Sequence, residues 1–386
     1  YLSNGVFEVV GKLFVNSLKM LVVPLVFCSI TVGITSLGNL SLMGRVGLKA
    51  IIIYLLTTAF AITLALIFAI FIEPGQGYEI DSSIQFSAKE APSLSSVLTS
   101  IVPSNPILAL ADGEMLQIIL FAIILGIAIT ITGSKAESFK KGIISLNEIM
   151  MSMVTIIMKF APLGVFCLIA KTFATQGIDM IIPLASYFFT VTLVLILHVL
   201  LTYSAFLKLI GKVSPFLFLK KMRTAIVFAF STASSNATIP VTLNTVEKRL
   251  GVDKSVASFT VPLGATINMD GTAIMQGVAT VFIASVYMVD LTIGDYLTVV
   301  LTATLASIGT AGVPGVGLIM LTMVLTQVGL PVEGVALIIG IDRLLDMMRT
   351  AVNITGDSMV SLITVSYTHL RAHETRHDLV CRLLLE

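Results

Sequence analysis

Tryptophan is absent from this chain of 386 residues, and charge is scarce, since Asp, Glu, Lys and Arg together make up only 12% of it. A soluble domain carries about 25% charged residues, so this chain lacks the polar residues that would cover a soluble protein. Its net charge of +1 gives no electrostatic basis for binding nucleic acid. Without tryptophan, any aromatic belt at a membrane surface is left to tyrosine.

Cysteine and histidine are also rare, with three and four residues respectively. Cys28 and Cys167 lie in apolar runs and Cys381 lies near the C-terminus, so no pair indicates a disulfide framework. His198 is the only histidine outside residues 365–386. It stands in an apolar run without a Ser–His or metal-ligand pattern, which argues against an enzyme and against an organic cofactor.

Long hydrophobic runs are what the chain does have, since 56% of its residues are hydrophobic. Each run is long enough to cross a hydrocarbon core of about 30 Å. The runs cover about 13–37, 47–73, 115–133, 143–170, 180–210, 255–290 and 333–364. They predict an all-α polytopic protein of the cell membrane, with the lipid bilayer as its surroundings.

Two further apolar segments, 216–247 and 296–328, are interrupted by STASSNATIP (231–240) and SIGTAGVPG (307–315). Each half is too short to span, so both segments are predicted to be re-entrant hairpins buried in protein. Two spans with polar kinks remain the alternative. INMDGT (267–272) interrupts another apolar run and predicts an unwound turn there. Such paired interruptions point to the binding site of a transporter.

Positive charge accumulates in the loops of one side, which is therefore predicted to be cytoplasmic. These residues are Arg45, Lys49, Lys135, Lys140, Lys141, Lys208, Lys212, Lys220, Lys221, Arg223, Lys248, Arg249 and Lys254. The opposite loops carry Lys89 and Lys171 among several acidic residues. The first hairpin then enters from the cytoplasm and the second from outside, as in an inverted repeat, and their tips can meet near the midplane.

Four polar residues of the last apolar run, Asp346, Arg349, Asn353 and Asp357, follow spacings of three, four and four. On a helix they fall within a stripe of roughly 80°, and Asp342 extends it. Charges within an apolar span face a bundle interior or an aqueous site. This stripe therefore marks the functional region.

The chemistry of the stripe suggests the ligand. Arg349 can hold a carboxylate in bidentate fashion, and Asp346 can accept from an ammonium group. Backbone N–H groups at the hairpin tips suit a second carboxylate. One amine and two carboxylates together predict an acidic amino acid as the ligand. Two alternatives stay open: Asp346 and Arg349 could form an internal ion pair, and Asp342 could pair structurally with Arg343.

Hard oxygen ligands for a small cation are predicted at the same place. Unwinding at 267–272 frees backbone carbonyls, and Asn268, Asp270, Asn353 and Asp357 add side-chain oxygens.

Several motifs carry a family resemblance: NMDGT (268–272), GTAGVPG (309–315), and Asp-x-x-Arg-Thr…Asn…Gly-Asp in the last run. Across residues 6–364 the chain resembles the dicarboxylate/amino acid:cation symporter family, also called the glutamate transporter or sodium:dicarboxylate symporter family. The resemblance implies a homotrimeric symporter that imports L-aspartate or L-glutamate with Na⁺ by an elevator motion. A C4-dicarboxylate or neutral amino acid carrier, or H⁺-coupled import, is the alternative.

The family fold implies a division of the chain into scaffold and transport segments. Scaffold segments would be 1–43 and 74–177; transport segments would be 44–73, 178–211, the hairpin 212–254, the broken helix 255–292, the hairpin 293–330 and the last helix 331–364.

The resemblance also implies residue roles. Substrate contacts would be Ser235, Thr272, Gly312, Val313, Asp346, Arg349, Thr350 and Asn353. Sodium ligands would be Gly264, Asn268, Asn353 and Asp357; Thr266, Ser307, Ile308 and Thr310; and Tyr54, Thr57, Thr58, Asn268 and Asp270. Met269 would lie between substrate and ions.

Three positions depart from relatives. Gln276 stands where animal members carry a glutamate associated with proton coupling, and Met347 where they carry an arginine associated with potassium counter-transport. Ala233 stands where archaeal members carry an arginine. These residues favour Na⁺ coupling without K⁺. Neutral amino acid carriers lack a counterpart of Arg349 and pure C4-dicarboxylate carriers one of Asp346, whereas this chain has both.

The two ends of the chain are expected to differ from those of relatives. Relatives that begin one helix earlier lead us to expect that a first transmembrane helix is missing. VSYTHLRAHET at the start of 365–386 resembles a translated sequencing adapter, so this tail is expected to be non-native.

Overall fold

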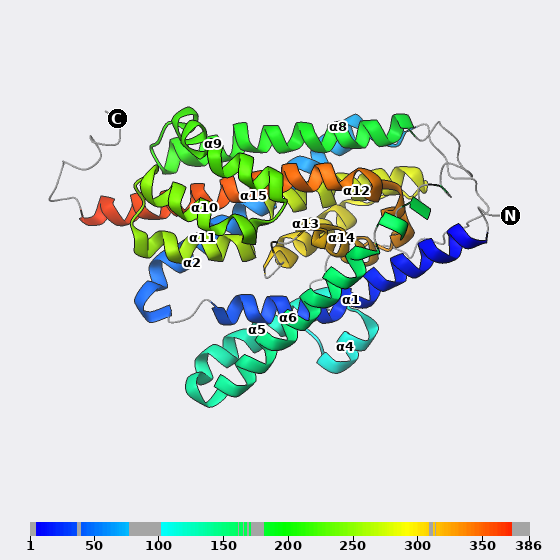
Figure 1. Ribbon diagram of the computed structural model, residues 1–386, viewed down its shortest axis with the longest axis horizontal. Coiled ribbons are helices and arrows are strands. Elements are labelled where there is room, and N and C mark those ends of the chain that lie inside the picture. Colours follow the sequence, from blue (N-terminus) through cyan, green and yellow to red (C-terminus); the bar gives the residue numbers. More distant parts are fainter. Residues whose placement is uncertain are drawn as a thin grey trace.

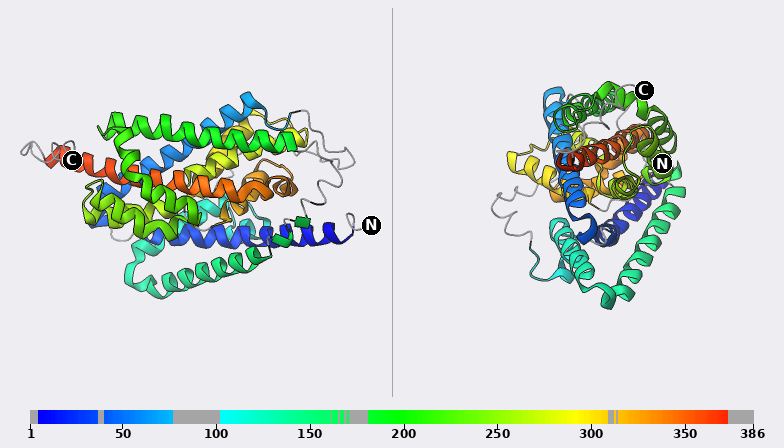
Figure 2. Two further views of the ribbon diagram at one scale, coloured as in Figure 1. Left: turned by 45° about the horizontal axis from the view of Figure 1, so that its top comes forward. Right: turned by 90° about the vertical axis from the view of Figure 1, so that its left-hand side faces the viewer.

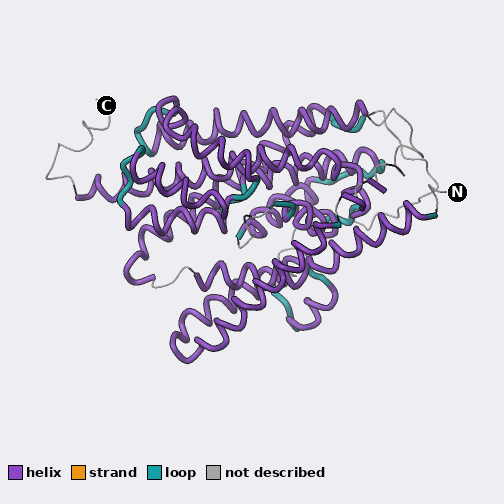
Figure 3. Tube along the Cα trace, in the orientation of Figure 1, coloured by secondary structure: helices purple, strands orange, loops and turns teal. Residues whose placement is uncertain are grey.

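Helices account for almost all of the computed structural model, and the part of the chain that it describes contains no strand (Figure 3). The described residues are 5–36, 40–76, 102–160, 162–164, 166–167, 170, 181–308, 312 and 314–372. The α-helices are α1 (Val6–Ser36), α2 (Leu40–Ile72), α4 (Pro106–Asp112), α5 (Met115–Thr132), α6 (Glu137–Lys159), α8 (Ile181–Leu197), α9 (Pro215–Thr232), α10 (Ser235–Lys248), α11 (Lys254–Ile267), α12 (Asp270–Val286), α13 (Ile293–Ser307), α14 (Val316–Gln327) and α15 (Val335–Ala372). The prediction of an all-α protein is confirmed.

The helices form two groups that lie side by side. α1, α4, α5 and α6 lie along one side, where α1 packs against both α5 and α6 (Figures 1 and 2). The remaining helices form a larger bundle around α12, which contacts α2, α8, α13, α14 and α15. A helix that is apolar on all sides belongs in such a core, and α12 is buried along nearly its whole length.

Four stretches of the described helices are long and apolar enough to cross a membrane. They are Gly47–Ile72, Gln117–Ile157, Ile182–Ile210 and Val256–Val286. The second, Gln117–Ile157, covers most of the predicted runs 115–133 and 143–170, because the 3₁₀ turn Gly133–Ala136 connects α5 directly to α6. The runs 13–37 and 333–364 lie mostly in α1 and α15, helices of 31 and 38 residues that are not among these four stretches.

The chain reverses at both predicted interruptions, so α9 packs against α10 and α13 against α14. At the first turn Ala233 is left-handed, with φ of 49°, and Ser234 caps α10. At the second, Gly315 has φ of 85° and opens α14. α13 and α14 have 15 and 12 residues, which at about 1.5 Å per residue is short of a full span. The re-entrant course of both hairpins stays a prediction.

The third interruption is confirmed as a break between two helices. α11 ends at Ile267 and α12 begins at Asp270, while Asn268 and Met269 are not helical. Met269 has φ of −124° and ψ of 42°, outside the helical region. The break presents Asn268 and Asp270 side by side in the core, where both are buried.

Some sequence predictions fall outside the described residues. They include Thr310 and Val313 at the second tip, residues 77–101 and 171–180, and residues 373–386 of the expected tail.

Candidate functional site

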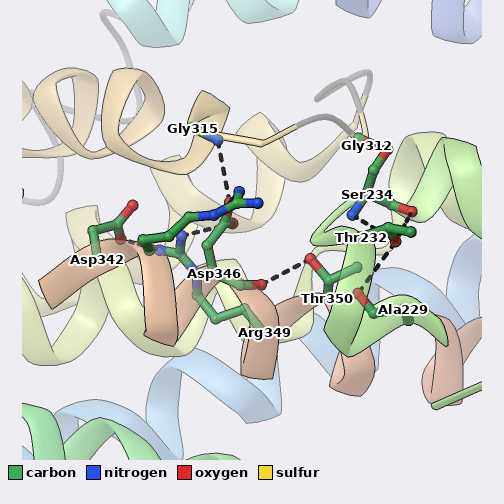
Figure 4. A network of polar contacts seen from close by, with 10 residues as sticks. Ala229, Thr232, Ser234, Gly312, Gly315, Asp342, Asp346, Arg349 and Thr350 are labelled. Atoms are coloured by element: carbon green, nitrogen blue, oxygen red, sulfur yellow. Dashed lines mark hydrogen bonds and ion pairs between the residues drawn. The ribbon is translucent and has the colours of Figure 1, made fainter. Parts of the chain in front are cut away.

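Arg349 is the centre of a buried charged cluster on α15 (Figure 4). Its side chain is 0% exposed, and its Nη2 donates to Asp346 Oδ1 at 2.8 Å. Its Nη1 lies 3.0 Å from Asp342 Oδ1 as an ion pair, yet neither atom makes a hydrogen bond with any described residue. Arg349 Nε also has no hydrogen-bond acceptor among the described residues. The described residues therefore leave part of the donor capacity of this buried guanidinium unused.

The two open alternatives for this cluster are resolved differently. Asp346 and Arg349 do form the internal ion pair. Asp342 is buried and pairs with Arg349, which shows that the suggested pair with Arg343 is wrong. Arg343 instead has a largely exposed side chain and approaches Asp346 Oδ2 at 3.9 Å. A helix places residues i and i+7 on one face, so the deeply buried Arg349 is within reach of Asp342.

The second hairpin closes over this cluster from the start of α14. The backbone N–H of Gly315 donates to Asp346 Oδ2 at 3.2 Å (Figure 4). Gly317 packs on the guanidinium so closely that a Cβ there would come within 3.2 Å of Arg349 Nη1. Thr350 Oγ1 donates to the Asp346 carbonyl at 2.8 Å, within α15. Both oxygens of the Asp346 carboxylate are therefore occupied in this conformation.

The two hairpin tips touch each other beside the cluster. Ser234 Oγ donates to the Gly312 carbonyl at 2.7 Å (Figure 4). The Asn236 N–H donates to the same oxygen at 3.1 Å. A Cβ on Gly312 would lie only 2.9 Å from Ser235 Cβ. The predicted meeting of the tips is thus observed, and it leaves no room for a side chain on Gly312.

A second polar cluster surrounds the break before α12. Asp270 and Asp357 are buried, at 0% and 1% exposure. Thr58 Oγ1 donates to Asp270 Oδ1 at 2.6 Å, and Asn268 Nδ2 donates to Asp357 Oδ1 at 2.9 Å. Among the described residues no Lys or Arg forms an ion pair with either carboxylate. Asn268 Oδ1 is buried without a described partner.

Gly264 brings α11 against this second cluster. A Cβ at Gly264 would lie 2.5 Å from Asp357 Oδ1 and 2.7 Å from the Tyr54 hydroxyl oxygen. Tyr54 donates to the Thr260 carbonyl at 3.0 Å, and Thr57 Oγ1 donates to the Tyr54 carbonyl at 3.0 Å. The fold thus brings together two of the three predicted cation groups.

Asn353 and Met269 connect the two clusters. Asn353 Oδ1 accepts from the Gly271 N–H at 2.7 Å, and its Nδ2 lies 3.4 Å from Met269 Sδ. Thr272 Oγ1 lies 3.9 Å from the same sulfur. The Asn268 Nδ2 donates to the Asn353 carbonyl at 3.0 Å. Asn353 lies about one turn after Arg349 and one turn before Asp357, so it stands between the arginine cluster and the carboxylates on α15.

Among the described residues, no hydrogen bond joins the members of the third predicted cation group to one another. Thr266 Oγ1 donates to the Pro262 carbonyl and Ser307 Oγ to the Thr304 carbonyl, each within its own helix. The Ile308 N–H donates to the Leu305 carbonyl. Thr310, the fourth member, lies outside the described residues. The described bonds therefore leave this third group as a prediction.

Two residues at the second cluster were not predicted from the sequence as site residues. Tyr203 donates to Asp270 Oδ2 at 2.8 Å, and His198 Nε2 lies 3.2 Å from the same oxygen. Both belong to a π-helical extension of α8. Residues five apart share no face of an α-helix, so α-helical periodicity carried no signal that would have grouped them.

Buried charges at the meeting point of a broken helix and two helical turns, inside a bundle of apolar helices, define a membrane transport protein. A model of the sodium:dicarboxylate symporter family matches residues 3–366. The chain belongs to this family of membrane symporters, which confirms the predicted family, a multi-pass membrane location and the absence of an enzymatic role.

Relatives with related names match along most of their length. A proton/sodium-glutamate symport protein of Bacillus caldotenax is 36% identical over 92% of this chain and 86% of its own. A proton/glutamate-aspartate symporter of Escherichia coli is 35% identical over 93% and 84%. A C4-dicarboxylate transport protein of Bacillus subtilis is 33% identical over 92% and 85%.

Proposed function

We propose that this symporter imports an acidic amino acid, L-aspartate or L-glutamate, together with Na⁺. The observation that carries the proposal is the fully buried Arg349, whose Nε and Nη1 find no hydrogen-bond acceptor among the described residues. Buried donors are costly to leave unpaired, and a planar guanidinium is suited to a carboxylate. Relatives named as glutamate and glutamate-aspartate symporters support this substrate class.

Asp346 supplies the partner for the substrate amine. In the structure its carboxylate accepts from Arg349 Nη2 and from the Gly315 N–H. A substrate ammonium would replace Arg349 at Asp346, which frees more of the guanidinium for the substrate side-chain carboxylate. Asp342 would remain at Arg349 and hold it in place. Binding is thus an exchange of partners within one buried ion-pair network.

The remaining substrate contacts follow the tips and the broken helix. The N-terminus of α10 at Ser235 offers backbone N–H groups that favour an anionic α-carboxylate. The other proposed contacts, supported by the family resemblance, are Thr272, Gly312, Val313, Thr350 and Asn353.

The charge balance calls for a co-transported cation. Asp342, Asp346, Asp270 and Asp357 are buried against the single positive charge of Arg349. An acidic amino acid adds one more net negative charge. Isolated buried charges are strongly unfavourable, so entry of the substrate requires cations to enter with it.

The oxygens around the break suit Na⁺ as cargo. Asp270, Asp357 and the unpartnered Oδ1 of Asn268 are hard ligands that lie close together. The proposed ligands supported by this geometry are Tyr54, Thr57, Thr58, Gly264, Asn268, Asp270, Asn353 and Asp357. The group Thr266, Ser307, Ile308 and Thr310 rests on the family resemblance alone.

An elevator motion in a homotrimer is part of the same proposal. The helices α1, α4, α5 and α6, which fall in the expected scaffold segments 1–43 and 74–177, lie together on one side (Figure 1). Both clusters and both tips belong to the other group of helices. A transport unit of 44–73 and 178–364, with two re-entrant hairpins, could therefore move against that scaffold with its cargo enclosed.

A C4-dicarboxylate is the second candidate, since one relative carries that name. The two substrates differ by an amine, for which Asp346 is the proposed partner. Asp346→Ala is expected to abolish aspartate uptake while leaving succinate uptake unaffected or improved. Uptake of labelled aspartate and of labelled succinate, each measured in the wild type and in Asp346→Ala, tests this, and retained aspartate affinity in the variant would favour the dicarboxylate.

Uptake into proteoliposomes tests the function itself. Purified protein should accumulate radiolabelled aspartate against its gradient when Na⁺ is higher outside. Imposed H⁺ or K⁺ gradients alone should give little uptake. Accumulation driven by H⁺ and unaffected by Na⁺ would instead establish the H⁺-coupled alternative.

A further inference from the structure

The end of α8 changes its helical winding near the site. After Leu197 the chain continues as two π-helical segments, His198–Tyr203 and Phe206–Ile210. π-Helical turns are rare and are frequently found at functional sites. Their presence here, in a run that is otherwise α-helical, calls for a local reason.

That reason is the geometry of two side chains. Residues five apart point about 140° away from each other on an α-helix. A π-helix closes its hydrogen bonds from i to i+5, which puts such residues on one face. His198 and Tyr203 are five apart, and their rings lie 4.6 Å from centroid to centroid. The π-helical winding therefore aims both rings at one point.

The point is one oxygen of Asp270. Tyr203 donates to Oδ2 at 2.8 Å and His198 Nε2 lies 3.2 Å from it, while Thr58 takes Oδ1. All four side chains are essentially fully buried. His198 Nδ1 has no partner among the described residues, so the contact with Asp270 is the polar interaction that orients the imidazole.

Room for this arrangement comes from α15. A Cβ on Gly356 would lie 2.5 Å from the Tyr203 hydroxyl oxygen and 2.5 Å from Asn268 Nδ2. The same hydroxyl lies 3.3 Å from the Val352 carbonyl. Tyr203 thus connects α8, α12 and α15 at the level of the buried carboxylates.

We propose that His198 and Tyr203 are positioning residues for cation binding, which hold Asp270 by Oδ2 so that its carboxylate stays aimed at the cation ligands. They touch neither substrate nor cation, and act by fixing the rotation of the carboxylate. Partners that orient a ligating carboxylate strengthen ion binding in this way. The inference rests on the proposed Na⁺-coupled function of Asp270.

Tyr203→Phe is the sharpest test, because it removes one hydroxyl and keeps the ring. A hydrogen bond to a charged group is strong enough that its loss should raise the Na⁺ concentration for half-maximal aspartate uptake about tenfold. The aspartate KM at saturating Na⁺ should change by less than about twofold. A purely structural role would instead lower protein yield and thermal stability without a Na⁺-specific shift.

His198 gives a rescue test. His198→Gln keeps an N–H that can reach Asp270, whereas His198→Leu keeps only bulk. The glutamine variant is expected to lie near wild type in its Na⁺ dependence, and the leucine variant to need about tenfold more Na⁺. Equal behaviour of the two variants would overturn the positioning role of His198.

The matched control is Tyr187→Phe. Tyr187 is also a fully buried tyrosine of α8, but its hydroxyl has no hydrogen-bond partner among the described residues. The Na⁺ concentration for half-maximal aspartate uptake by Tyr187→Phe should equal that of the wild type. If wild-type uptake responds to Na⁺ and Tyr203→Phe does not shift that response, the positioning role is wrong while the proposed Na⁺-coupled function stands. If wild-type uptake ignores Na⁺, the proposed function fails, and the inference fails with it.

Discussion

Arg349 carries most of the chemistry at the scale of single residues. It is a fully buried guanidinium held between two carboxylates of its own helix, with Nε and Nη1 making no hydrogen bond to any described residue. The two aspartates, Asp342 and Asp346, differ in their other contacts. Asp342 has the arginine as its only ion-pair partner among the described residues, whereas Asp346 also reaches the second hairpin through Gly315.

Arg349→Cys should therefore change substrate choice. Removing one partner of a buried, hydrogen-bonded charge pair costs about 2–5 kcal/mol, so aspartate affinity should fall at least about 30-fold. The vacated space should admit small neutral amino acids such as serine, whose side chains need no cation. Labelled aspartate and serine uptake measured side by side checks this.

A stability measurement serves as its control, because the substitution leaves two aspartates unpaired. Thermal unfolding of the variant in detergent should still be cooperative. Aspartate uptake at the wild-type level in a folded Arg349→Cys protein would contradict the assignment of the substrate carboxylate to Arg349.

Sequence reasoning reached this residue level only in part. The spacing of Asp346, Arg349, Asn353 and Asp357 in an apolar run predicted one buried stripe, and all four are buried. The partner of Asp342 could not be predicted, because Arg343 and Arg349 are both within reach along a helix. Burial decided, since Arg343 reaches solvent and Arg349 does not.

At the scale of elements, three helix breaks build the site. The break before α12 gathers oxygens, and the two hairpin turns supply N–H groups and close the site. The contact between the turns depends on few bonds, since Ser234 Oγ and the Asn236 N–H share one carbonyl at Gly312. Ser234 also caps α10 by accepting from the Ala237 N–H at 3.2 Å.

Ser234→Ala is expected to loosen this closure. Loss of an N-cap costs about 1 kcal/mol, and the bond to Gly312 is lost with it. Aspartate dissociation should become at least about fivefold faster, with a smaller change in association. Release of labelled aspartate from detergent-solubilised protein measures the rate.

Ser231→Ala is the matched control in the same hairpin. Ser231 is exposed, and its hydroxyl donates only to the Val227 carbonyl of its own helix. The rate of aspartate dissociation from Ser231→Ala should equal that of the wild type. Equal rates in both variants would show that the Ser234–Gly312 contact does not hold the hairpins together.

At the scale of the whole molecule, ligands and fold stabilise each other. The larger helix group surrounds several uncompensated carboxylates, so it should be least stable when empty. A ligand that binds only the folded state stabilises it by mass action, by about 2.7 kcal/mol at a concentration 100-fold above Kd.

Thermal unfolding in detergent should therefore depend on the ions present. Replacing choline by Na⁺ is expected to raise the Tm by several degrees, and aspartate should raise it further only when Na⁺ is present. Aspartate stabilisation that is equal in choline and in Na⁺ would contradict the coupling. Size measurements of the same samples should give three times the 41.2 kDa chain mass if the protein is a trimer.

The sequence by itself determined the class of protein and the positions of its breaks. Scarce charge and long apolar runs require a membrane environment, and clusters of glycine, proline, asparagine and serine marked the three places where the long apolar segments are broken. These are local properties, which the chain carries without its neighbours. The polar stripe on α15 is local too, because helical periodicity alone aligns it.

Only the tertiary structure decided which groups meet. It paired Asp342 with Arg349, joined the hairpin tips at Gly312, and brought Asp270 to residues of α2 and α8 that are more than sixty positions away. It also wound the end of α8 as a π-helix, so that His198 and Tyr203 face one carboxylate. Such contacts depend on how helices pack and on which polar groups would otherwise be buried alone, and no pattern along a single helix contains that information.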